Sequence, residues 1–288
     1  MINKNQEADM ELQFVVDRQL CIGCGECARD CPYGLIEMQG DVPAMDREKA
    51  GMCIQCQHCL AVCSTGAVSI MGKNPADSLA MPDNPPTAQQ LAALMKARRS
   101  TRRFQSKPVS REEIAFLLET AAYAPTGRNN RQVLFTVIED PGVMEELRKA
   151  TYKTLAEKIA AGGLPQGMEF LGKAATAASR DGQDIIFRGA PHLLMASAPK
   201  DGVAPEVDCH IALSYFDLLA AGMGIGTLWC GLANWTLTRL APEIVSGLGV
   251  PDDHRVGYTM VFGRPAVRYY RTAQRDDARI NRVQILGC

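Results

Sequence analysis

The chain has 288 residues, of which 47% are hydrophobic and 22% charged. This balance is typical of globular proteins and excludes disordered and fibrous architectures, and the length predicts about two domains. A net charge of −1 argues against a protein that binds nucleic acid by broad phosphate neutralisation. Residues 1–80 carry 6 basic and 11 acidic side chains, whereas residues 81–288 carry 25 and 21. An acidic N-terminal part therefore precedes a mildly basic remainder.

Cysteine is the most informative residue type, with 11 in the chain and eight of them between residues 21 and 63. The N-terminus is polar and does not resemble a signal peptide, so we expect a cytoplasmic protein whose cysteines stay reduced. The eight form two runs with the same C-x2-C-x2-C-x3-C spacing, offset by 32 residues. The first run is Cys21, Cys24, Cys27 and Cys31, and the second is Cys53, Cys56, Cys59 and Cys63.

This spacing favours iron–sulfur clusters over zinc, because zinc sites usually pair two C-x2-C knuckles. The runs resemble those of two-cluster bacterial ferredoxins over residues 14–72. The resemblance implies two [4Fe–4S] clusters, with the fourth cysteine of each run ligating the cluster of the other run. One cluster would then use Cys63 and the other Cys31. Ser64 departs from the family pattern, because the first run has Pro32 at the corresponding position.

Residues 73–87 contain four prolines, which favour an extended linker between two domains. We expect a ferredoxin-type domain over 1–80 and a second domain over 88–288. Two capping boxes, Thr87 with Gln90 and Ser110 with Glu113, predict helix starts. Hydrophobic periodicity predicts further helices over 142–160, 168–178 and 206–222, and strands over 133–138, 192–198, 227–229 and 256–262. Helices alternating with short strands indicate an α/β or α+β domain.

Residues 218–238 contain no charged side chain and approach the length of a membrane span. Several glycines interrupt the segment, so we interpret it as a buried helix followed by a buried strand, and we expect no membrane association. The four histidines, His58, His192, His210 and His254, have no evident carboxylate partner in the sequence and are interpreted as structural or exposed.

Two polar stretches of the second domain suggest a cofactor site. Residues 98–104 read R-R-S-T-R-R-F, which could be a solvated surface run or a set of donors for a phosphate. Residues 124–129 read A-P-T-G-R-N, which alone would be an ordinary turn. Together with the motifs at 190–191, 222–229 and 262–265, they resemble the nitroreductase family of FMN-dependent reductases over residues 88–275. The resemblance implies an α+β fold, an FMN cofactor and a homodimer.

The family's cofactor-binding positions transfer to this sequence as expectations. The residues expected to hold the FMN phosphate and ribityl chain are Arg98, Arg99, Ser100 and Arg102. The residues expected to line the flavin ring are Pro125, Thr126 and Asn129. Cys230 and Gly231 match the segment whose amides approach flavin N5 and O4, and Arg271 and Arg275 match basic residues that close over the phosphate. Arg131 and Gln132 depart from the family's usual Gln-Pro. A Rossmann site is disfavoured, because residues 222–227 lack the third glycine of the fingerprint and precede a strand.

We therefore expect an oxidoreductase in which two clusters exchange electrons with FMN, which reduces a small electron-poor acceptor such as a nitroaromatic, a quinone or an enone. Ferredoxin or NAD(P)H could be the donor. An electron-transfer module serving a protein partner is the alternative, and reductive dehalogenation or flavin breakdown is a third hypothesis. No catalytic proton donor is identified. Residues 151–190, with Met168, Phe170 and Leu171, are a candidate substrate lid or a dimer-packing segment.

Overall fold

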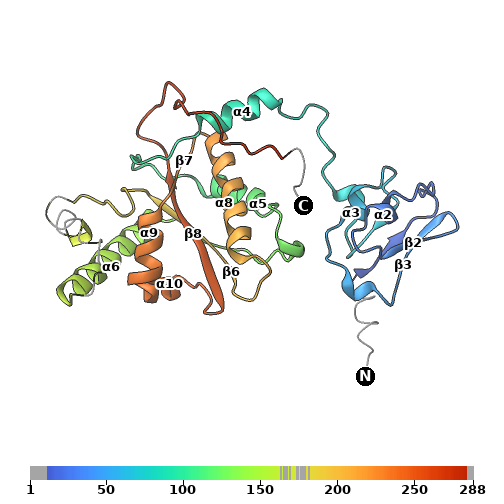
Figure 1. Cartoon of the computed structure of the whole chain (residues 1–288), viewed down its shortest axis with the longest axis horizontal. Helices are drawn as coiled ribbons and strands as arrows, with labels where there is room; N and C mark the ends of the chain where they lie inside the picture. Colours follow the sequence, from blue (N-terminus) through green and yellow to red (C-terminus); the bar gives the residue numbers. More distant parts are fainter. Residues whose placement is uncertain are drawn as a thin grey trace. The chain divides into compact units, whose positions relative to one another are not determined.

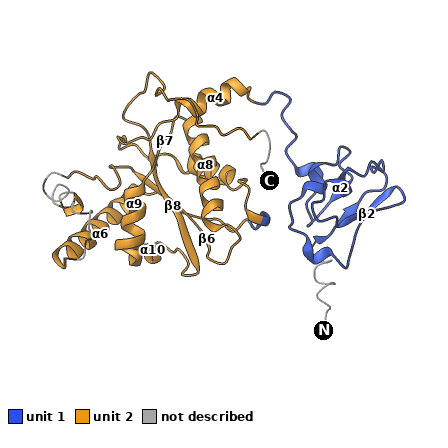
Figure 2. Ribbon diagram, in the orientation of Figure 1, with its two compact units in different colours: residues 1–85, 128–130 blue, residues 86–127, 131–288 orange. Residues whose placement is uncertain are grey.

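The computed structural model describes residues 12–162, 164, 168, 170–172, 175, 180 and 182–283 (Figure 1). The chain divides into two compact units (Figure 2). Unit 1 comprises residues 1–85 together with 128–130, and unit 2 comprises residues 86–127 and 131–288. Within the described residues, no helix combines the length and the apolar character that crossing a membrane requires.

Unit 1 consists of two small antiparallel ribbons and short helices, arranged as two similar halves. Strand β1 pairs with β4, and β2 pairs with β3. The buried cluster of the unit contains Ile36, Leu60, Val68 and Ile70 together with the thiols of Cys27 and Cys59, so two predicted cluster ligands belong to its core. The elements are β1 (Val15–Val16), α2 (Glu26–Arg29), β2 (Ile36–Gln39), β3 (Val42–Met45), η1 (Ala50–Met52), α3 (His58–Ala61), β4 (Val68–Ser69) and η2 (Pro75–Asp77).

The two cysteine runs repeat the same backbone conformation with different residues. In the first run Gly23 and Gly25 have φ angles of 67° and 73°. The corresponding residues 32 positions later are Gln55 and Gln57, with φ angles of 54° and 62°. Left-handed backbone is easy for glycine and costs about 1–2 kcal/mol for a residue with a Cβ atom. The second run therefore carries backbone strain that the first run lacks.

Unit 2 is built on a four-stranded antiparallel sheet in the order β5-β6-β8-β7. The central strand β6 is buried along almost its whole length, and its side chains alternate between two hydrophobic clusters. Leu193 and Met195 face one cluster, whereas Leu194 and Ala196 face the other. Helices cover both faces of the sheet, with α6, α9 and α10 on one side and α5 and α8 on the other (Figure 1). The predicted α+β class is confirmed, and the antiparallel sheet excludes a Rossmann fold.

The helix starts agree closely with those expected from the sequence. Both capping boxes form, with Thr87 preceding α4 and Ser110 preceding α5. The Glu113 carboxylate of the second box also accepts hydrogen bonds from the Arg264 guanidinium at the end of β8. The elements are α4 (Ala88–Ala97), α5 (Arg111–Ala121), η3 (Gly127–Asn129), β5 (Leu134–Ile138), α6 (Pro141–Ala160), β6 (His192–Pro199), α8 (Pro205–Gly222), β7 (Gly226–Trp229), α9 (Gly231–Trp235), η4 (Thr236–Leu240), α10 (Pro242–Gly247) and β8 (His254–Gly263).

The structure differs from the sequence expectations in two places. Two further expectations fall partly outside the described residues. Residues 231–247 form α9, the π-helical η4 and α10, none of which was predicted. His58 does have a carboxylate partner, because its Nδ1 lies 3.2 Å from Asp30 Oδ2. Residues 170–172 and 175 of the predicted helix 168–178 are helical, and most of its other residues lie outside the described part. Of the candidate lid residues, Leu171 is buried and Phe170 is 45% exposed.

We expect the stability of unit 2 to depend on pH through His192, which begins β6. Its ring is fully buried, and its Nε2 accepts a hydrogen bond of 2.9 Å from the Val109 amide. Burial lowers the pKa of His192 below its ordinary value of 6.5. Below about pH 6.5 the unfolded chain therefore binds a proton that the folded chain does not. The free energy of unfolding should fall by up to about 1.4 kcal/mol per pH unit.

His192→Gln should reduce this dependence between pH 7.5 and 5.5, because a neutral amide can still accept from Val109. Urea unfolding followed by tryptophan fluorescence measures it, since both tryptophans, Trp229 and Trp235, belong to unit 2. His210→Gln is the matched control, because His210 is exposed. An unchanged pH dependence in His192→Gln would contradict this account.

Candidate functional site

The eight cysteines of the two runs lie in unit 1, and the last cysteine of each run lies near cysteines of the other run. A small cavity is lined by the thiols of Cys21, Cys24, Cys27 and Cys63, which combine three ligands of the first run with the last of the second. Burial and then the neighbouring thiols of Cys63 and Cys24 raise the pKa of Cys27. Burial and then Cys56 and Cys31 raise the pKa of Cys53. Each group thus includes the fourth cysteine of the opposite run, which supports the crossed ligand sets.

Backbone amides point at the cysteine sulfurs in the same way in both runs. The Leu35 amide donates to Cys31 Sγ at 3.4 Å, and the Ala67 amide donates to Cys63 Sγ at 3.2 Å. The Gln55 amide also donates to Cys53 Sγ. Such donors stabilise thiolates and raise the potential of an iron–sulfur cluster. In the described part of the chain, no three His, Cys, Asp or Glu side chains form a group that could hold a single metal ion. Four cysteines around one small cavity match the number of thiolate ligands that a [4Fe–4S] cluster takes.

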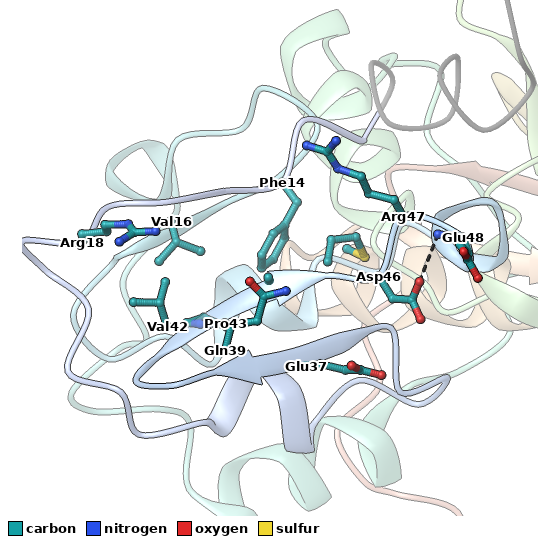
Figure 3. Close-up of a pocket in the computed structure, with 12 residues that line it drawn as sticks. Phe14, Val16, Arg18, Glu37, Gln39, Val42, Pro43, Asp46, Arg47 and Glu48 are labelled. Carbon is teal, nitrogen blue, oxygen red and sulfur yellow. Dashed lines mark hydrogen bonds between the residues drawn. The ribbon is translucent and has the colours of Figure 1, made fainter.

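A second cavity of unit 1 has no cysteine in its lining. It has a volume of about 790 Å³ and lies between residues 14–18 and the β2–β3 ribbon (Figure 3). Its charged lining residues have both signs, and one of them, Asp46, accepts a hydrogen bond from the Glu48 amide. The cavity lining contains no cysteine, although Pro43 lines both this cavity and the small cavity beside the cysteines. The labelled side chains in Figure 3 are Phe14, Val16, Arg18, Glu37, Gln39, Val42, Pro43, Asp46, Arg47 and Glu48.

In unit 2 the predicted phosphate-binding run is extended and is held by strands β7 and β8. Helix α4 ends at Ala97, and the Thr101 amide then donates to the Thr227 carbonyl oxygen at 2.8 Å. Farther along, the Gln105 amide donates to Arg264, and the Ala266 amide donates to Arg103. In an extended chain successive side chains point to opposite sides, so Arg98, Ser100 and Arg102 share one side. Arg99, which was also expected to hold FMN, alternates to the other side, and binding of FMN by this run stays a prediction.

The arginines of the run differ in their surroundings. Arg98 Nε lies 3.4 Å from Asp217 Oδ2, whereas Arg98 Nη1 is buried without a hydrogen-bond partner among the described residues. Leaving a buried hydrogen-bond donor without a partner costs about 1–3 kcal/mol of stability. The Arg98 Nη1 edge of the guanidinium therefore fits a bound acceptor such as a phosphate oxygen. Arg99 donates to the carbonyl oxygens of Arg98 and Lys96 and thereby caps α4. Arg102 is exposed.

The predicted flavin loop follows α5 and is fixed by hydrogen bonds to its backbone. The Gly127 amide donates to Asp208 Oδ1 at 2.8 Å, and the Arg131 amide donates to Thr126 Oγ1 at 2.9 Å. Pro125 is exposed. Within unit 1, the Asn129 side-chain amide donates to the Ile54 carbonyl oxygen at 2.9 Å. Contact of Asn129 with the flavin ring stays a prediction. For that contact the Asn129 side-chain amide must either bond to the flavin and the Ile54 carbonyl oxygen together or leave the Ile54 carbonyl oxygen.

The remaining predicted cofactor residues lie in two places. The Cys230 amide donates to the Thr259 carbonyl oxygen, and the buried Cys230 thiol donates to Ile186. Gly231 begins α9, so its amide has no helical acceptor and is the better candidate to approach the flavin. Arg271 and Arg275 are exposed on an irregular segment, and their closure over a phosphate stays a prediction. The sequence interpretation missed Asp208 and Asp217, although acidic residues within an apolar helix are a signal that could have identified them.

Comparisons with known proteins agree with this organisation. A model of the nitroreductase family matches residues 95–264, and a 4Fe-4S dicluster domain model matches residues 20–67. An iodotyrosine deiodinase from Thermotoga neapolitana is 24% identical over 181 residues, which cover 59% of this chain and 93% of that protein. FMN-bound nitroreductases from Bacteroides fragilis and Desulfitobacterium hafniense are similar structures, each with a TM-score of 0.53. They are 23% and 24% identical and cover 67% of this chain and 99% and 98% of their own.

The chain therefore belongs to the nitroreductase family of oxidoreductases, and it carries an N-terminal 4Fe–4S ferredoxin-type domain. The resemblances recognised in the sequence are confirmed. The solved structures show the fold, and the assignment of individual cofactor-binding residues depends on the geometry described above.

Arg102 provides the cleanest test of the phosphate-binding run. We expect Arg102→Ala to weaken FMN binding about tenfold to a hundredfold, because it removes a charge-assisted hydrogen bond of roughly 1.5–3 kcal/mol. Arg98→Ala should also weaken it, but this change leaves the Asp217 carboxylate buried without its cation. Arg103→Ala is the matched control, since Arg103 is also exposed and its side chain points to the opposite side. Flavin titration of the apoprotein measures both. Equal affinities for the two variants would show that the run does not bind FMN as assigned.

Proposed function

We propose that the protein is an FMN-dependent oxidoreductase in which two [4Fe–4S] clusters exchange electrons with FMN. The main support is that one chain combines crossed cysteine groups with a nitroreductase domain. In that domain the buried Arg98 Nη1 atom has no hydrogen-bond partner among the described residues. Clusters carry single electrons, whereas FMN, when bound, can accept electrons singly and deliver them in pairs. Covalent linkage of the two domains raises the effective concentration of the electron carrier.

The acceptor we propose is a small electron-poor molecule such as a nitroaromatic, a quinone or an enone. Such acceptors take two electrons, which matches delivery by a flavin. Reductive dehalogenation is a second candidate, because a curated relative is an iodotyrosine deiodinase. The two activities are distinguished by their products under anaerobic conditions, since dehalogenation releases halide and nitro reduction does not. Reduced ferredoxin and NAD(P)H are the donors to be compared.

We also propose a homodimer, as expected for this family. Its support in this chain is the apolar surface on α5 and α8, where Phe116, Val207 and Tyr215 are 52%, 55% and 43% exposed. Exposed apolar side chains on two helices that pack side by side can contribute to a protein interface. The alternative to an enzyme is an electron-transfer module that serves a protein partner. An open, apolar cavity above the flavin ring would favour the enzyme. A flavin ring covered by protein would favour the electron-transfer module.

Cofactor content tests the composition directly. After anaerobic purification we expect about eight iron atoms, eight acid-labile sulfides and one FMN per chain, from two clusters of four irons and one flavin site. Light scattering should give twice the 31.3 kDa mass of one chain. Zinc without sulfide would contradict the cluster assignment, and a monomer with full flavin content would contradict the dimer alone.

Cys56→Ala tests the direction of electron flow, because it removes one ligand of the cluster completed by Cys31. If the clusters supply the flavin, turnover driven by reduced ferredoxin should collapse, while chemically reduced flavin should still reduce the acceptor and FMN should stay bound. Ser64→Ala is the matched control in the same unit, since it changes a residue beside Cys63 without removing a ligand. Full NADH-driven activity in Cys56→Ala, with no ferredoxin-driven activity in the wild type, would contradict the supply model and favour the clusters as an electron outlet.

A further inference from the structure

Helix α8 contains two acidic residues that are almost completely buried, Asp208 in its first turn and Asp217 farther along. Asp208 is 2% exposed and Asp217 is 6% exposed, whereas most of the buried residues around them are apolar. Burying a carboxylate is unfavourable unless hydrogen-bond donors or a cation compensate for the lost water. Both aspartates have such partners, and in both cases a partner belongs to a segment that we expect to bind FMN.

Asp217 joins helix α8 to β7 and to the phosphate-binding run. The Thr227 hydroxyl donates to Asp217 Oδ1, and the Trp229 indole donates to Oδ2 at 3.0 Å. Arg98 Nε lies 3.4 Å from the same Oδ2 atom. The carboxylate therefore holds the Nε edge of the guanidinium, while Arg98 Nη1 has no hydrogen-bond partner among the described residues. A planar guanidinium fixed at one edge presents its other edge in a defined direction.

Asp208 supports the predicted flavin loop. Its Oδ1 atom accepts the Gly127 amide hydrogen, and its Oδ2 atom is buried without a hydrogen-bond partner in the described part of the chain. The Gly127 position is also tight, because a Cβ atom there would lie 3.1 Å from the Val203 Cβ atom. The Gly127 amide is therefore held by a single carboxylate oxygen, and a side-chain amide oxygen could replace it.

The two aspartates are nine positions apart, which is two and a half helical turns and about 13.5 Å. They therefore project from opposite sides of α8, one toward β7 and the other toward the loop after α5. We infer that Asp208 and Asp217 are positioning residues for FMN. Asp217 orients Arg98 toward the phosphate, and Asp208 fixes the loop at Gly127 against the flavin ring. This inference rests on the proposed function, because it assumes that the two segments bind FMN.

Comparison of FMN with riboflavin, which lacks the phosphate, separates the two roles. Asp217→Asn should lower the affinity for FMN about tenfold or more, the range of a charge-assisted hydrogen bond, and leave the affinity for riboflavin within about twofold. Asp208→Ala should lower the affinities for FMN and riboflavin by the same factor and change the absorption spectrum of bound flavin. Asp208→Asn should restore both, because its amide oxygen can accept the Gly127 hydrogen bond.

The measurement is flavin titration into the deflavinated full-length protein, with circular dichroism as a check of folding. Glu206→Gln is the matched control on the same helix, because Glu206 is exposed and its carboxylate pairs with Arg255 at 2.7 Å. Asp217→Glu, which keeps the charge but displaces the carboxylate by one methylene, replaces Asp217→Asn if that variant fails to fold. It should also lower the preference for FMN over riboflavin.

Equal losses for FMN and riboflavin in the Asp217 variants would overturn the role of Asp217, since a purely structural residue affects both ligands alike. Loss of binding in Asp208→Asn equal to that in Asp208→Ala would overturn the role of Asp208. Failure of the proposed function would look different, because the wild-type protein would then show no saturable FMN binding.

Discussion

Burial of strand β6 on both faces is the constraint on which the architecture of unit 2 depends. Every residue from His192 to Ala198 is buried, so neither face of the sheet can be left to water. Two helical layers are then needed, and α8 becomes a helix that packs against the sheet and against α5. A polar group on such a helix must find its partner within the protein. This explains why the two aspartates of α8 reach out to specific groups on neighbouring segments.

Unit 1 depends on a different source of stability. Its buried cluster is small and includes two of the cysteines themselves, so the hydrophobic core and the ligand set are partly the same residues. A domain of this size buries a limited fraction of its surface, and metal binding commonly contributes the missing free energy of folding. Binding of the proposed clusters would then be coupled to folding of this unit, whereas unit 2 has two apolar clusters of its own.

The sequence predicted best those features that depend on neighbouring residues. Both capping boxes and the ends of α6, α8, β6 and β7 were placed within about two residues, because local spacing determines them. Helices α9 and α10 and the segment η4 were missed, because they are short and lie in an apolar stretch without a clear period. The crossed cysteine groups followed from a family resemblance and not from spacing. The Asp217–Arg98 pair joins residues far apart in the chain, and only the packing of α8 beside the run reveals it.

The pair of glutamines in the second cysteine run has a consequence for how a lost cluster is rebuilt. Gln55 and Gln57 occupy left-handed backbone that Gly23 and Gly25 adopt without strain in the first run. A cluster bound to each run would hold its loop in place. Without its cluster the second loop could relieve this strain, whereas the first loop has none to relieve. Rebuilding a cluster on Cys53, Cys56 and Cys59 would then also have to restore the two left-handed residues, at a cost of about 1–2 kcal/mol each that the first run does not carry.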